Sequence, residues 1–64
     1  MKLSRMYRGA VARSLWHVRQ GDVTTGYFMI DALVLVAIGN YQDDASYDND
    51  IVILQRVRKL ISFT

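Results

Sequence analysis

The sequence predicts an all-α protein, a compact three-helix unit whose central helix is largely buried. Two stretches, one near each end of the chain, carry apolar residues at three- and four-residue steps, the spacing of an amphipathic helix. The stretch between them is apolar on nearly every side, which is typical of a helix buried by its neighbours. Glycine and aspartate residues separate the three stretches, and the chain has no proline. We therefore expect residues 1–64 to form a single helical domain.

The first helix is expected over about residues 3–19. Ser4 is a suitable N-cap, because its hydroxyl can accept a hydrogen bond from the first turn. Gly21 suits the left-handed backbone position that follows the last turn of a helix. One stripe of the helix carries the residues that we expect to face the core: Leu3, Met6, Tyr7, Ala10, Val11, Ser14, Leu15 and Val18.

The second helix is expected over about residues 24–38. Asp22 and the two threonines after it offer N-caps, and Gly39 followed by Asn40 offers a stop. The alternative is an α+β fold with residues 27–38 as a strand, because the β-branched residues Val34, Val36 and Ile38 alternate along it. The length of the stretch favours a helix.

The third helix is expected over about residues 49–62, after an acidic loop at 40–48. Asp48 and Asp50 lie near its start and basic residues lie towards its end, an order that the helix dipole favours. Its apolar stripe comprises Ile53, Leu54, Val57, Leu60 and Ile61.

Two amphipathic neighbours cannot cover a central helix that is apolar all round, so we expect a homodimer, the commonest closed assembly. A chain this small has little core of its own, and without cysteine it has no disulfide to stabilise it. Burying a carboxylate on such a helix is costly unless it is paired. Asp31 is therefore expected either on a narrow solvent-exposed strip or paired with an arginine. The expected oligomer interface comprises Phe28, Ile30, Leu33, Val34 and Ala37.

The side of the first helix opposite its apolar stripe carries the only tryptophan of the chain among arginines, and residues 1–21 contain no acid. Tryptophan and arginine dominate the energetics of protein interfaces. We therefore predict a partner-binding surface made of Arg5, Arg8, Ala12, Arg13, Trp16 and Arg19. One alternative is that Trp16 folds over the gap left by Gly9 and Ala12 or packs on a neighbouring helix. The other is that it stacks on a nucleic-acid base beside phosphate-binding arginines.

The acidic loop is a second candidate contact surface, because aromatic rings flank its carboxylates. Its alternating oxygen ligands resemble the start of a calcium loop, but Asn49 replaces the glycine and Gln55 the closing glutamate, so we expect no metal. The candidate contact residues are Tyr41, Asp43, Asp44 and Tyr47.

Catalysis is not expected. Ser14 and His17 are one helical step apart, but no acid in the first helix could orient the imidazole. No phosphate-binding glycine loop is present either, and no cofactor is implied.

We therefore expect a small non-enzymatic interaction protein that docks onto a larger protein, as a regulator or inhibitor of the kind often encoded by viruses or mobile elements. The alternative is a small DNA- or RNA-binding protein that uses the basic first helix. We expect it in the cytoplasm, since arginines interrupt any signal-peptide core. No membrane span is expected, since the most apolar run, 27–38, is short of about 20 residues and contains Asp31.

Overall fold

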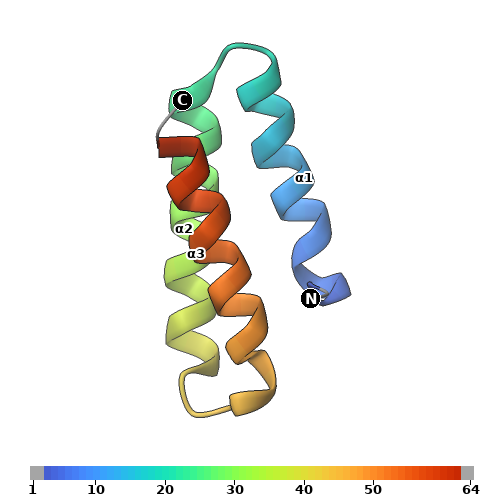
Figure 1. Cartoon of the computed structure of the whole chain (residues 1–64), viewed down its shortest axis with the longest axis vertical. Coiled ribbons are helices and arrows are strands. Elements are labelled where there is room, and N and C mark those ends of the chain that lie inside the picture. The colour runs from blue at the N-terminus through green and yellow to red at the C-terminus, as the bar shows by residue number, and fades with distance from the viewer. Residues whose placement is uncertain (1–2, 63–64) are drawn as a thin grey trace.

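The computed structural model describes residues 3–62, which form three α-helices joined by short connections (Figure 1). Helix α1 spans Arg5–Arg19, α2 spans Val23–Tyr41 and α3 spans Asp48–Ser62, with a short 3-10 helix, η1, at Ala45–Tyr47. No strand occurs within residues 3–62, so the all-α prediction is confirmed. The alternative strand over 27–38 is wrong, because this stretch is the middle of a 19-residue helix.

The connection between α1 and α2 follows the sequence signals. Gly21 adopts the predicted left-handed backbone, with φ of +87°, and the Asp22 carboxylate caps α2 by accepting a hydrogen bond from the Thr25 backbone N–H at 3.1 Å. Ser4 occupies the N-cap of α1 as predicted, but its side chain makes no capping hydrogen bond. The turn between α1 and α2 is therefore where local sequence chemistry places it.

The C-terminal end of α2 differs from the prediction. The stop expected at Gly39 is wrong, because this glycine keeps right-handed backbone angles and the helix continues to Tyr41. The Tyr41 ring meets Tyr7 edge-on at 6.3 Å between centroids and stacks on Tyr47 at 3.9 Å. This aromatic packing holds the last turn of α2, so the acidic connection is shorter than the expected 40–48 and α3 starts at Asp48.

Helix α2 lies in the centre and runs antiparallel to both neighbours, while α1 and α3 contact each other very little (Figure 1). All three helices contribute to one apolar core. Met6 of α1 and Leu60 of α3 were expected in this core, but both are exposed. The buried apolar residues are Tyr7 from α1, Ile30, Val34 and Ala37 from α2, and Leu54 and Ile61 from α3.

The crossing of α1 and α2 is closest at Gly26, which is buried. A Cβ atom at this position would lie 2.5 Å from Val18 Cγ2 and 2.7 Å from the Ser14 carbonyl oxygen. Ser14 is itself buried, and its hydroxyl donates to the Ala10 carbonyl of its own helix at 3.1 Å. The two backbones can approach this closely only because position 26 has no side chain.

The carboxylate of Asp31 is paired with an arginine, which is one of the two arrangements that we expected from the sequence. Arg58 Nη1 of α3 lies 3.1 Å from Asp31 Oδ1, and both side chains are partly exposed. An ion pair that is this exposed to solvent contributes little net stability. It does give the single charge of the apolar α2 a partner, and it marks the edge where α3 covers α2.

Replacing Gly26 with alanine should destabilise the fold although alanine is the better helix former. The propensity gain is about 1 kcal/mol, but forcing a methyl group into a closed contact costs about 1–3 kcal/mol, and the contact atom at Ser14 is backbone. Gly9→Ala is the matched control, because a Cβ atom there meets nothing within 4 Å and should stabilise α1. Thermal and urea unfolding of both variants measure the difference, and a Gly26→Ala protein as stable as Gly9→Ala would contradict the close approach.

Candidate functional site

The side of α1 turned away from α2 is the first candidate surface, called here the α1 outer face. All six residues predicted from the sequence for partner binding are exposed on it. Tyr7 and Ser14 are the buried residues of α1 and mark its opposite side. The α1 outer face comprises Arg5, Arg8, Ala12, Arg13, Trp16 and Arg19.

Trp16 is 57% exposed, as expected for the side opposite the apolar stripe. Its indole meets the neighbouring His17 ring edge-on, with centroids 5.0 Å apart. It does not fold over Gly9, because a Cβ atom built at Gly9 would meet no atom within 4 Å. The indole therefore lies exposed on the last turn of α1 and is not part of the core.

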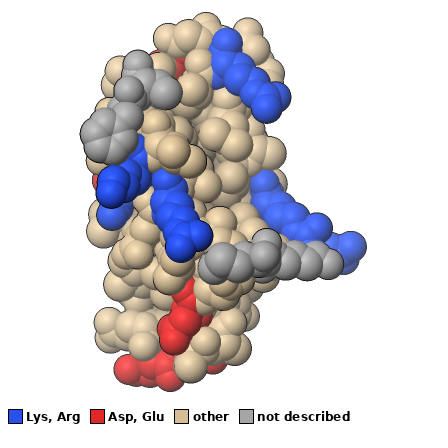
Figure 2. All heavy atoms as spheres, viewed as in Figure 1, with Lys and Arg blue, Asp and Glu red and all other residues tan. Residues whose placement is uncertain are grey.

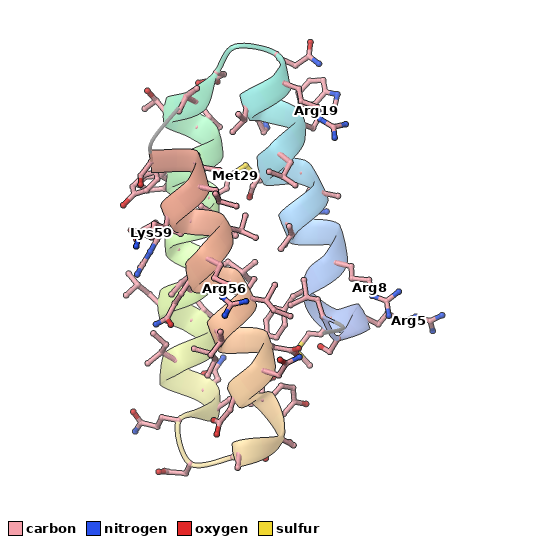
Figure 3. All side chains as sticks on the ribbon, in the orientation of Figure 1. Arg5, Arg8, Arg19, Met29, Arg56 and Lys59 are labelled. Atoms are coloured by element: carbon pink, nitrogen blue, oxygen red, sulfur yellow. The ribbon has the colours of Figure 1, made fainter. Side chains whose placement is uncertain are left out.

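The arginines of the α1 outer face are largely free of internal ion pairs. Arg8 Nε donates to the Leu3 carbonyl at 3.1 Å. Within residues 3–62, neither Arg5, Arg13 nor Arg19 forms an ion pair with a carboxylate. Arg5, Arg8 and Arg19 extend from α1 away from the other helices (Figure 3), so their charge is available to an external partner.

Charge is separated along the long axis of the molecule. Figure 2 shows lysine and arginine over the faces of α1 and α3, and the largest group of aspartates at the end where α2 connects to α3. Asp22, the N-cap of α2, lies at the other end. Trp16 lies in the last turn of α1, which is at the other end of the molecule (Figure 1). The part of the α1 outer face around Trp16 is therefore well separated from the acidic α2–α3 connection.

The second predicted surface, in the α2–α3 connection, is mostly occupied by internal contacts. Tyr41 and Tyr47 are half-buried, stack on each other and pack against the core. The Asp44 carboxylate accepts hydrogen bonds from the Ser46 hydroxyl at 2.6 Å and the Ser46 backbone N–H at 3.1 Å, and these bonds hold the pKa of Asp44 below its usual range. Asp43 is exposed. Three of the four predicted residues thus build the connection itself.

A buried carboxylate joins α3 to the start of α1, a feature that the sequence analysis missed. Asp50 lies in the first turn of α3 as predicted, but it is only 5% exposed, and its Oδ1 accepts the Ser4 backbone N–H at 3.0 Å. Its position four residues before the buried Leu54 places it on the core stripe, and this spacing could have indicated the burial. This hydrogen bond therefore links the start of α3 to the start of α1.

The expected oligomer interface needs correction. Ile30, Val34 and Ala37 are fully buried inside a single chain, because α1 and α3 cover that side of α2. Leu33 is half-buried, and only Phe28 is well exposed, at 73%. Three of the five predicted residues are therefore unavailable to a second copy of the folded chain.

The uncovered side of α2 is called here the α2 outer face and carries a different set of residues. Leu35 is 62% exposed and Val36 is 54% exposed. A shallow groove of about 330 Å³ runs beside this face, between α2 and Ala10 of α1. By length and composition α2 could also cross a membrane, a test that core helices of soluble proteins pass as well. The α2 outer face comprises Phe28, Ala32, Leu35, Val36 and Gly39.

The described residues offer little catalytic chemistry. The Ser14 hydroxyl is buried and donates within its own helix, and His17 packs against Trp16. Within residues 3–62, no group of three or more His, Cys, Asp or Glu side chains is arranged to hold a metal ion. The α1 outer face and the α2 outer face are therefore the candidates for function.

No family model, no curated protein and no solved structure matches this chain. Function must therefore be argued from the two surfaces themselves.

Alkaline pH should destabilise the fold through Tyr7. Burial, with smaller contributions from neighbouring Tyr41 and Asp50, raises the pKa of Tyr7 from 10.0 to about 12. Because the unfolded chain loses this proton first, the free energy of unfolding should be unaffected by Tyr7 below pH 10 and should fall as the pH rises from 10 to 12. The total effect corresponds to roughly 2–3 kcal/mol.

Urea unfolding at several pH values measures this dependence, with Tyr7→Phe as the control because it lacks the titrating hydroxyl. The variant should lose less stability than the parent between pH 10 and 12, although the other tyrosines still titrate. Parallel pH profiles for the parent and Tyr7→Phe would show that burial of Tyr7 is not the cause.

Proposed function

We propose that this chain is a small non-enzymatic binding protein that docks its α1 outer face onto an acidic surface of a larger protein. The observation that carries the proposal is Trp16, 57% exposed on a helix whose arginines have no carboxylate partner within residues 3–62. A large exposed indole with arginine side chains around it has the composition of an interface hot spot.

The geometry also supports rapid and specific docking. Trp16 is anchored in the last turn of a 15-residue helix, so little backbone freedom is lost when a partner covers it. The arginines before and after it supply long-range attraction to an acidic surface, which raises the association rate more than the final affinity. The indole supplies the desolvated contact, and its two side-chain torsions cost little to fix.

The chemistry of the described residues favours a regulatory or inhibitory role for such a contact. Within residues 3–62, no group of three or more His, Cys, Asp or Glu side chains is arranged to hold a metal ion, and the Ser14 hydroxyl is buried and bonded within its own helix. The effect of the chain on a larger protein would then come from occupying a surface of that protein, as a regulator or an inhibitor does.

Nucleic-acid binding is the second candidate, and the charge separation favours it. Arg56 and Lys59 of α3 add to the positive face seen with α1, while the acidic loop lies at the far end (Figures 2 and 3). Phosphate contacts would make affinity fall steeply between roughly 50 and 200 mM salt. A contact centred on Trp16 should weaken far less, so a salt titration separates the two functions.

Trp16→Ala should weaken docking strongly without unfolding the protein. Because the indole is mostly exposed, the melting temperature should change little, while affinity for the partner should fall by about 2 kcal/mol or more, roughly 30-fold. The partner is captured from the source cells after nuclease treatment, and binding is then measured with the purified pair. The single tryptophan also reports the contact directly, because its emission should shift to the blue when the partner covers it.

Leu60→Ala is the matched control, since it truncates an apolar side chain on α3 that is also well exposed, at 69%. It should bind like the parent. A Trp16→Ala protein that folds and binds as tightly as Leu60→Ala would remove the basis of the proposal. Binding that survives nuclease but disappears steeply with salt, and that Trp16→Ala leaves intact, would count against it as well.

A further inference from the structure

The α1 outer face has a central row of residues with arginines on both of its sides. The row follows steps of four, three and four along the helix, a spacing that keeps its members in one line: Arg5, Gly9, Ala12 and Trp16. Gly9 and Ala12 form a low strip within the row, since a Cβ atom built at Gly9 would meet nothing within 4 Å. The exposed indole of Trp16 stands at one end of this strip.

Arginines border the row on each side. Arg8 stands four residues after Ser4, whose backbone N–H bonds to α3, and Arg19 follows Arg8 after three helical turns. These two arginines therefore lie on the side nearer α3. Arg13 borders the other side, since it stands three residues after Ala10, which lines the groove beside α2.

The chain supplies no carboxylate to these arginines. Residues 1–21 contain no acid, and within residues 3–62 neither Arg5, Arg13 nor Arg19 forms an ion pair with a carboxylate. Asp22 is the next acid along the sequence, but its carboxylate caps α2 by accepting the Thr25 backbone N–H. The face is therefore complementary to carboxylates placed on both sides of an apolar row.

We infer that the part of the partner that covers this face is an acidic amphipathic helix, lying along the row from Arg5 to Trp16. The inference rests on the proposed function and adds to it the chemistry and shape of the partner. An apolar stripe bordered by Glu or Asp is the complement of a low apolar strip bordered by arginines. Arginine binds carboxylates bidentately, which fixes how the two helices lie along each other.

The low strip determines how closely the second helix can approach. Axes of packed helices lie about 8–10 Å apart, depending on the side chains at the contact, and Gly9 and Ala12 are the two smallest residues. With a helix seated on this strip, the Trp16 indole, which is 57% exposed, packs against its apolar stripe. Docking therefore depends on Gly9, although a side chain there would touch nothing within the chain itself.

Two other acidic ligands match this face less well. In an extended acidic segment the side chains alternate between two faces, so half of them point away from the row. A nucleic-acid duplex binds through its phosphates, and the strip of Gly9 and Ala12 offers them no side-chain donor. Of the three, only a helix brings both an apolar stripe and two acidic borders.

A designed peptide tests the inference without an identified partner. The probe is a peptide of three heptads with Leu at the a and d positions and Glu at e and g. Its binding should shift the emission of Trp16 to the blue, with a dissociation constant below about 100 μM. Affinity should fall about tenfold or more when Lys replaces every Glu, or when a proline in the central heptad breaks the helix.

Gly9→Leu tests the close approach. A leucine there points into open space, so circular dichroism should show an intact fold. Affinity for the probe should fall about tenfold or more, because the side chain holds the second helix away from α1. Gly39→Leu is the matched control and should bind like the parent, because its Cβ atom also meets nothing within 4 Å but lies on α2. Equal affinities of the two variants would contradict the inference.

Three further results would overturn it. One is a probe that leaves the Trp16 emission unchanged up to about 1 mM. Another is a proline-containing peptide that binds as tightly as the helical one, which would assign the face to an extended acidic segment. The third is a mixed-sequence DNA duplex that displaces the probe at a physiological ionic strength of about 0.15 M, which would assign the face to nucleic acid.

Failure of the inference and failure of the proposed function are distinguishable with the captured partner. A partner that loses affinity for Trp16→Ala but not for Gly9→Leu would leave the docking surface in place and show that the bound element is not a helix on the strip. A partner that binds Trp16→Ala as tightly as the parent would remove the proposed function, and with it the inference.

Discussion

A single constraint runs through this molecule: α2 is apolar on almost every side and has only two helices to cover it. Helices α1 and α3 bury one side of it, with Ile30, Val34 and Ala37 at the centre of the core. The opposite side stays open, and Phe28, Leu35 and Val36 remain exposed there. The approach of α1 is set by Gly26, since any side chain there would push the helices apart and uncover still more of α2.

The polar groups are arranged around that constraint. Where α3 meets α2, Arg58 neutralises the one charge on the apolar helix. Where α1 and α3 hardly touch, Asp50 reaches from the first turn of α3 to the Ser4 backbone and links them with a hydrogen bond. The tyrosine stack at Tyr41 and Tyr47 closes the same end of the molecule. The arginines of α1 have no carboxylate partner within residues 3–62 and lie on the surface.

The sequence predicts features that depend on one segment and misses those that depend on how segments meet. The turn at Gly21, the cap at Asp22 and the exposure of Trp16 follow from local chemistry and helical periodicity. The stop expected at Gly39 failed because the aromatic packing of Tyr41 with Tyr7 and Tyr47 extends the helix. The expected interface failed for Ile30, Val34 and Ala37 because an all-apolar helix has no periodicity to say which side its neighbours take.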